Sequence, residues 1–238
     1  MYIYSMKNDR ILKIKRITLF VLLFPFFLGF SKVKAQKINQ FTKDNKRTGV
    51  WKKYHSNKRI RYTGSFVNGK EVGVFKYYSM VSSEHPIVIK TFSKETGIAK
   101  VAFYSVEGKL ESSGEMDGEK RVGKWFFYLK DGLTLISEEF YINGVLNGTA
   151  TTYYRNGKIT ESLNYKDGKL EGSVKRFSDE GVLLDDLNYA NGKLEGLAKY
   201  YNTFGKLRAF GNYENDIKVG KWQYFENEEP INPNKINN

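Results

Sequence analysis

The sequence contains no cysteine, only two histidines and only four prolines among its 238 residues. The lack of cysteine excludes disulfide bonds, thiolate zinc sites and a lipoprotein anchor on an N-terminal cysteine. His55 and His85 stand apart, and neither has a carboxylate at metal-ligand spacing, so we predict no metal and no cofactor. The sequence also lacks a phosphate-loop motif and a serine nucleophile elbow. We therefore expect a protein that is not an enzyme and has no catalytic residues.

Glycine and aromatic residues are abundant instead, with 22 Gly, 17 Tyr and 17 Phe. After residue 48 they recur with a period of about 24 residues, each segment opening with an anchor glycine and carrying an aromatic residue five positions later. The anchor glycines are Gly49, Gly73, Gly123, Gly148, Gly172, Gly196 and Gly220. The gap of 50 residues after Gly73 predicts one degenerate copy, from Ile98 to Phe103. Such a period is typical of a repeat protein.

Each repeat contains two turn signals and no room for a helix. In the copy that begins at Gly148, we expect a strand over 149–154, a turn at 155–158, a second strand over 159–165 and a second turn at 166–169. Asn-Gly and Asp-Gly pairs in such turns are strong signals for β-hairpins. The pattern predicts an all-β fold, an elongated single antiparallel meander of about eight hairpins. We expect a short linker over 36–48, the repeat domain over 49–228 and a disordered tail over 229–238.

The N-terminal segment has the pattern of a secretory signal peptide over 1–35. Five basic residues lie between 7 and 16, and the apolar run over 17–30 has Thr18 as its one polar side chain. Val33 and Ala35 then supply the small residues that signal peptidase requires. The pattern predicts a leader helix, cleavage after Ala35 and export to the periplasm or the cell exterior. An uncleaved N-terminal membrane anchor is the alternative, although an apolar run of 14 residues is short for a membrane span.

Removal of the leader changes the net charge from +13 to +7. This balance predicts a solvated, moderately basic surface, or contact with an anionic partner such as a lipid headgroup or an acidic glycan. The part after the leader has no cluster typical of nucleic-acid binding, so we expect no nucleic acid as a partner.

The strands suggest which side chains are structural. Alternation on the returning strands predicts that Tyr165, Tyr189 and Tyr213 face the core. On the forward strands aromatic residues occur on both faces, with the fifth position on one face and the second and fourth on the other. Trp and Ala share the second position, which suggests an open face. We predict binding residues at Trp51, Phe75, Trp125, Phe127, Tyr200, Trp222 and Tyr224.

The repeat core, Gly-x-Trp-x-x-Tyr followed by Asn-Gly-Lys-Ile and Tyr-x-x-Gly-Lys-x-x-Gly, resembles the bacterial MORN-repeat variant family over about residues 46–228. The resemblance implies a chain of hairpins and a role in scaffolding or attachment, sometimes at membranes. Many members are labelled antitoxins of the YwqK type. No catalytic residues belong to the motif.

These observations predict an exported, non-enzymatic repeat scaffold that mediates protein–protein interaction in the cell envelope. The alternatives are a module that binds lipid headgroups or glycans, and an antitoxin-like neutralising protein.

Overall fold

The computed structural model of the chain describes residues 37–93 and 95–231. The predicted signal peptide lies outside these residues. The described residues form strands and turns without any helix, so none of them forms a helix long and apolar enough to cross a membrane. The all-β, antiparallel prediction is confirmed for this part of the chain, which builds one sheet of 20 strands.

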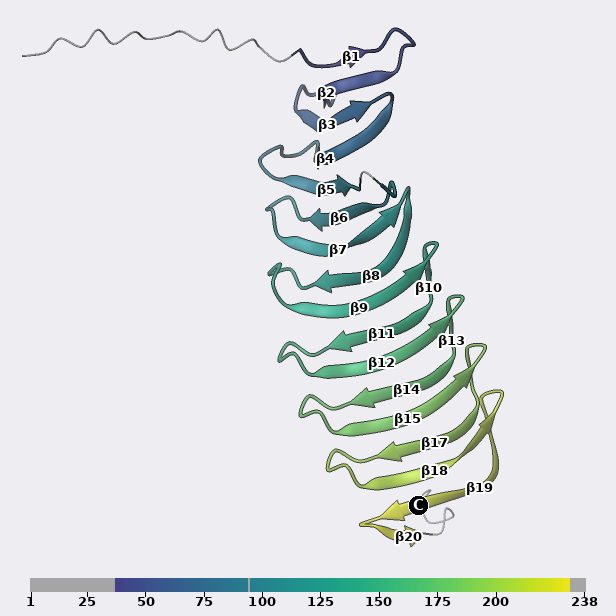
Figure 1. Ribbon diagram of the computed structural model, residues 1–238. Helices are drawn as coiled ribbons and strands as arrows, with labels where there is room; N and C mark the ends of the chain where they lie inside the picture. Colours follow the sequence, from purple (N-terminus) through teal and green to yellow (C-terminus); the bar gives the residue numbers. More distant parts are fainter. Residues whose placement is uncertain (1–36, 94, 232–238) are drawn as a thin grey trace, which may run out of the picture. The chain divides into compact units, whose positions relative to one another are not determined.

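The strands cross the sheet in chain order and pair antiparallel, so that hairpin stacks upon hairpin (Figure 1). In three places two consecutive strands pair with the same preceding strand and form two pieces of one forward strand. They are β1 (Gln40–Phe41), β2 (Arg47–Tyr54), β3 (Ile60–Val67), β4 (Lys70–Tyr78), β5 (Pro86–Phe92), β6 (Ala99–Tyr104), β7 (Leu110–Asp117), β8 (Lys120–Tyr128), β9 (Leu135–Ile142), β10 (Val145–Leu146), β11 (Gly148–Tyr153), β12 (Ile159–Lys166), β13 (Lys169–Leu170), β14 (Gly172–Phe177), β15 (Leu183–Ala190), β16 (Lys193–Leu194), β17 (Gly196–Tyr201), β18 (Leu207–Glu214), β19 (Ile217–Glu226) and β20 (Glu229–Ile231).

The hairpin turns have the backbone that their sequences predict. At Asp167-Gly168 both residues have positive φ, 51° and 79°, as a type I′ turn requires. The anchor glycines also have positive φ, for example 82° at Gly172, where a side chain would have space but not an unstrained backbone. The strand is interrupted just before this glycine, between β13 and β14. The anchor glycine thus bends each forward strand at a fixed point.

The degenerate copy has a different alignment from the one we predicted. Ala99, not Ile98, occupies the anchor register, because Ala99 pairs with Met116 as Gly49 pairs with Phe66. The fifth-position aromatic of this copy is therefore Tyr104 rather than Phe103. Phe103 lies on the opposite face, with its ring 6.0 Å from that of Trp125. The longer connections on either side of β5 conceal this shift in the sequence.

The boundaries of the repeat domain also need correction. The segment predicted as a linker contains β1, which pairs with the start of β2. The first three residues of the tail predicted to be disordered form β20, which pairs with β19 through Tyr224 and Ile231. These short strands add backbone hydrogen bonds to both ends of the sheet, where the hydrophobic pattern of a full repeat is missing.

The core lies along one face of the sheet, which we call the core face, and it consists of three clusters in a row. The first contains Trp51, Phe66 and Phe75, the second Ala99, Val101 and Trp125, and the third Val174, Leu187 and Ala198. The second-position residue of each forward strand contributes to this row. The returning-strand tyrosines pack beside it, with Tyr189 and Tyr213 against the third cluster, as predicted.

Large and small residues in the row compensate for each other. The ring of Trp125 lies flat on Gly114 of the preceding strand, where an added Cβ would be 2.5 Å from the ring. Where the second position holds Val174 or Ala198, the residue 11 positions earlier is a leucine, Leu163 or Leu187. Our inference that a position accepting both Trp and Ala must be open is wrong, because the partner position supplies the missing volume.

Candidate binding site

Four of the seven predicted binding residues belong to the core. Trp51 is 8% exposed, and Phe75 and Trp125 are fully buried, so these three side chains cannot contact a partner. Phe127 is half-buried, with its ring 6.3 Å from that of Trp125. The prediction for Trp51, Phe75 and Trp125 is corrected, because a one-residue change in the assignment of faces exchanges core and surface along a whole strand.

The buried tryptophans are held by specific contacts on both sides. Nε1 of Trp125 donates a hydrogen bond to the carbonyl of Glu115, at 3.0 Å. The guanidinium of Arg121 lies 4.6 Å above the indole ring and 5.4 Å from the ring of Tyr141. Arg121 precedes the anchor glycine by two residues, so the bend at that glycine places the cation over the ring. Each ring is therefore enclosed between a neighbouring strand and a cation.

The remaining three predicted residues, Tyr200, Trp222 and Tyr224, come together in one pocket at the C-terminal end of the core face. The pocket has a volume of about 770 Å³ and is formed by β17, β18, β19 and β20. Tyr213 and Ile231 also line it. Trp222 is half-buried, whereas the equivalent Trp125 is covered by the strands that follow. The pocket is thus the uncovered end of the core row.

The aromatic rings of the pocket form a tilted platform. The rings of Tyr200 and Tyr224 each lie 6.2 Å from that of Trp222, at angles of 30° and 33° to it. Tyr213 closes one side, edge-on to Trp222 at 5.1 Å. Nε1 of Trp222 donates to the carbonyl of Asn212, which fixes the indole. Such an arrangement presents a large apolar surface in a defined geometry.

Polar groups surround this platform. Nζ of Lys218 lies 4.2 Å from the Trp222 ring and 3.4 Å from the Tyr224 hydroxyl, to which it donates. Lys206 and Glu228 form an ion pair at 3.4 Å on the rim. Burial, and then the hydrogen bond with Tyr213, raise the pKa of the Tyr200 hydroxyl. That hydroxyl therefore remains protonated, and it shares a hydrogen bond with the hydroxyl of Tyr213. The groups present suit recognition of a ligand by stacking and hydrogen bonding.

The sequence reasoning missed two residues of the pocket, Tyr213 and Lys218. Tyr213 was assigned a structural role only, although among the described residues only the short β20 follows β19, and its pairing begins at Tyr224. Lys218 occupies the position two residues before an anchor glycine, where Arg47 and Arg121 also cover a tryptophan. A Lys or Arg occurs at this position in every repeat whose second position is Trp, and this pattern in the sequence could have identified Lys218.

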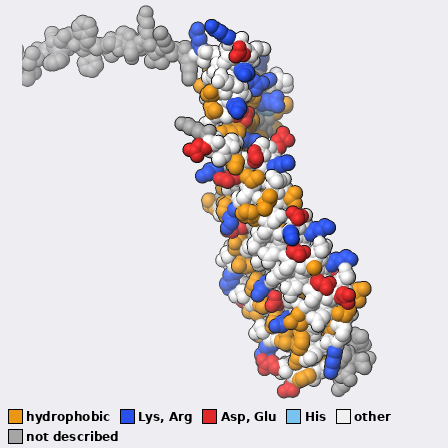
Figure 2. Space-filling view, turned by 45° about the vertical axis from the view of Figure 1, so that its right-hand side comes forward, with side chains coloured by type: hydrophobic (Ala, Val, Ile, Leu, Met, Phe, Trp, Pro, Cys, Tyr) orange, Lys and Arg blue, Asp and Glu red, His pale blue; other side chains and the backbone are white. Residues whose placement is uncertain are grey.

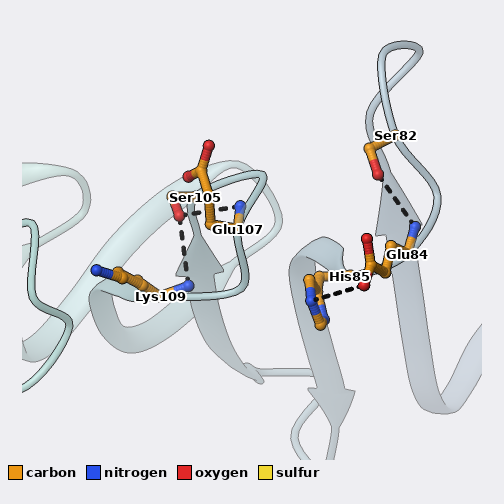
Figure 3. Close-up of polar contacts among 6 residues, drawn as sticks. All are labelled: Ser82, Glu84, His85, Ser105, Glu107 and Lys109. Atoms are coloured by element: carbon orange, nitrogen blue, oxygen red, sulfur yellow. Dashed lines mark hydrogen bonds and ion pairs between the residues drawn. The ribbon is translucent and has the colours of Figure 1, made fainter.

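The two histidines have structural contacts. Nε2 of His55 is 3.0 Å from the carbonyl of Tyr78 in the next unit. At the equivalent position of a later unit, the Tyr154 hydroxyl donates a hydrogen bond to the carbonyl of Phe177. His85 is 3.8 Å from Glu84 and packs against the turn glycine Gly108. Figure 3 shows the surroundings of His85, where Ser82 and Ser105 accept hydrogen bonds from backbone amides of their own turns. These contacts close turns.

Comparison with protein families gives a match at two places. The model described as MORN repeat variant matches residues 47–68 and 146–167. The first match spans β2 and β3, and the second runs from the end of β10 through β12, so each covers a forward strand, its turn and the returning strand. Among curated proteins no match is found. The hairpins of this sheet thus include MORN-variant repeats, and the match supports a protein of the MORN-variant type.

Proposed function

We propose that this protein is an exported, non-enzymatic repeat scaffold that binds a protein partner through the C-terminal aromatic pocket. The observation that carries the proposal is the contrast between Trp222 and Trp125. The same side chain in the same repeat position is half-exposed in the last unit and fully buried in an interior one. An aromatic row that ends uncovered costs stability, because apolar surface stays in contact with water. A partner that covers the row removes this cost.

The composition of the pocket supports a protein as the partner. Protein interfaces are enriched in Trp, Tyr and Arg at their centres and have polar rims. Here Trp222 and three tyrosines form the centre, while Lys206, Arg208 and Glu228 lie around them. The rings are already fixed by Asn212 and by one another, so little side-chain entropy is lost when a partner docks.

The test uses the mature protein, residues 36–238, as bait in a cell-envelope extract, followed by identification of what it retains. Tyr224→Ala removes one ring of the pocket and is expected to lower retention of the specific partner. Phe127→Ala, at the same repeat position in an interior unit, is the matched control and should retain it. Thermal melting of both variants shows that each remains folded. Equal retention by wild type and Tyr224→Ala would refute a role for the pocket.

Glycan binding is a second candidate, because Tyr200 and Tyr224 flank Trp222 at angles of 30° and 33°, and exposed aromatic rings can stack against sugar faces. Under this alternative, soluble oligosaccharides would compete with the retained molecule, and Trp222→Phe would weaken the sugar more than a protein partner. Competition by sugar without any retained protein would favour the glycan module over the protein scaffold.

Export is part of the same proposal and rests on the leader pattern. Cleavage after Ala35 is expected to release the repeat domain. Intact mass measurement of the exported species distinguishes the cleaved protein from the uncleaved one. A mass that includes residues 1–35 would mean that the segment remains as a membrane anchor.

A further inference from the structure

The positive charge of the mature chain is concentrated at the N-terminal end of the sheet. Residues 37–78 contain eleven Lys and Arg but only two Asp and Glu, a net charge of +9. Residues 79–231 contain 20 basic and 23 acidic residues, a net charge of −3. Figure 2 shows blue side chains crowded over the upper strands, with little red among them. The excess therefore lies over β1 to β4.

These cations have no acidic partners within the part of the chain that the structure describes. The ion pairs there involve His85, Lys124, Arg176 and Lys206, all beyond residue 78. Like charges that are held together without counter-charges repel one another and raise the local potential. The first two hairpins thus keep an unfavourable charge arrangement that the other hairpins avoid.

The contrast is sharpest on the outer face, opposite the core. In the first hairpins Lys52 pairs with Thr63, which pairs with Lys76, so two lysines flank a neutral residue. At the equivalent positions of later units, Lys175 pairs with Asp186, which pairs with Lys199. The sheet is the same in both places. In the first hairpins the residue between the two lysines is Thr63, which has no carboxylate.

The shape of this basic end favours a flexible protein segment over a flat membrane. Lys52 and Lys76 project from the outer face, Arg47 covers Trp51 on the core face, and Lys58 and Arg59 lie in the turn at the edge. Exposed charges are screened beyond about 8 Å at physiological salt, so a flat membrane surface can interact with the charges on one side of the sheet only. A chain that wraps around the end of the sheet reaches all of them.

The edge of the sheet at this end supplies a contact that only a polypeptide can use. The pairing of β1 with β2 covers Arg47 and Thr48 alone, and Asn39 adds hydrogen bonds to Val50 and Lys52. Among the described residues no strand lies beside β2 from Lys53 to Tyr54. An extended peptide can add main-chain hydrogen bonds at these two residues, while its side chains meet the lysines.

We infer that the first two hairpins dock an acidic, extended segment of a partner protein. This inference rests on the proposed scaffold function and names a second contact surface, separate from the aromatic pocket. Glutamate or aspartate side chains of the partner supply the counter-charges that Asp186 supplies within the later row. Because the contacts are exposed charge pairs, the interaction forms quickly and weakens steeply as salt is added.

The experiment measures binding of a labelled peptide of alternating glutamate and threonine to the mature protein by fluorescence anisotropy. The double variant Lys52→Gln with Lys76→Gln should weaken binding roughly three- to tenfold, the scale of losing two exposed charge contacts. The matched control, Lys175→Gln with Lys199→Gln, removes the same charge from the same repeat positions and should change binding less than about twofold. A peptide of alternating glutamine and threonine should not bind.

Three outcomes would overturn the inference. Equal weakening by both double variants would mean that the peptide responds to net charge alone. Binding to phosphatidylglycerol vesicles, with no binding of the acidic peptide, would assign the basic end to a membrane surface. The proposed scaffold function is tested separately, because it predicts loss of the partner in Tyr224→Ala. A partner retained by the Lys52 and Lys76 variant but lost from Tyr224→Ala would reject the basic surface and keep the pocket.

Discussion

The strands from β2 to β9 and those from β10 to β18 bury the same row of positions with different side chains. In the first region Phe75 and Trp125 are large and lie on Gly64 and Gly114. In the second region Val174 and Ala198 are small, and Leu163 and Leu187 fill the space. The comparison shows that two positions 11 residues apart share one volume in the core. Either of the two residues can be the large one that fills it.

The two regions also cover the row differently. Arg47 and Arg121 lie over the rings of the first region, in the position two residues before the anchor glycine. At the equivalent position in the second region, Leu170 and Leu194 pack against the aliphatic cluster. A tryptophan ring attracts a cation, whereas aliphatic side chains do not, so at these units the covering residue follows the chemistry of what it covers; beside Phe75 the same position holds Glu71. Three positions therefore vary together as one packing unit.

The largest expected effect comes from removing the largest buried ring. Trp125→Ala should lower the free energy of unfolding by about 3–5 kcal/mol, because it leaves a cavity above Gly114. Val174→Ala, at the same repeat position in the aliphatic region, should cost clearly less, since fewer atoms are removed. Urea denaturation monitored by circular dichroism measures both. Equal losses would mean that the ring contributes no more than an aliphatic residue and would remove the distinction between the regions.

The next prediction converts one region into the other. Gly114→Leu should cost about 1–3 kcal/mol or more, because its side chain overlaps the Trp125 ring. Combined with Trp125→Ala, the same leucine should fill the cavity, as Leu187 does beside Ala198. The double variant should then be more stable than the sum of the single losses by about 1–3 kcal/mol. Additive losses would show that the two positions do not share a volume.

The period, the turns and the antiparallel pairing could be predicted from the sequence because each depends on local chemistry. Asp167-Gly168 needs positive φ whatever surrounds it, and the anchor glycines mark each bend. The core face could not be assigned in the same way, because Trp125 and Tyr128 put aromatic residues on both faces of one strand. That choice depends on a contact between strands, namely the fit of a ring on Gly114.

The pocket was predicted only in part for the same reason. Tyr200, Trp222 and Tyr224 were chosen as members of an open face, and among the described residues they are accessible because only the short β20 follows β19. The equivalent Phe75 and Trp125 have the same local sequence and are buried. Position within the array, which no local pattern contains, decides exposure.

A smaller effect is expected from the covering cation. Arg121→Ala should cost about 1–2 kcal/mol, since it removes a guanidinium stacked on three rings together with the aliphatic stem that shields them. Arg121→Leu should recover part of this loss by restoring the apolar cover found at Leu170 and Leu194. Arg155→Ala, in an exposed turn, serves as the control. Thermal melting that ranks Arg121→Leu below Arg121→Ala would indicate that leucine does not fit this position, and an Arg121→Ala variant as stable as wild type would indicate that the arginine provides no stabilisation.

The smallest effect is a dependence of stability on pH that arises from Tyr77 in the aromatic region. Burial, and then the nearby Glu71, raise the pKa of Tyr77 to about 12, and its hydroxyl donates to Glu71 at 3.4 Å. In the unfolded chain the hydroxyl ionises near pH 10, so the folded state holds the proton more tightly and stability falls as pH rises from about 10 to about 12. Tyr77→Phe removes this contribution, so its stability relative to wild type should improve across that window and stay constant below it. The expected change is less than about 1 kcal/mol, because the side chain is partly exposed and solvent screens its charge.

Glu71→Gln removes the second cause of the raised pKa while leaving the burial, so it should reduce the pH-dependent part of the stability without abolishing it. Unfolding curves for the three proteins at several pH values between 9 and 12 measure the differences, and parallel curves for wild type and Tyr77→Phe would show that Tyr77 is as free to ionise in the sheet as in the unfolded chain.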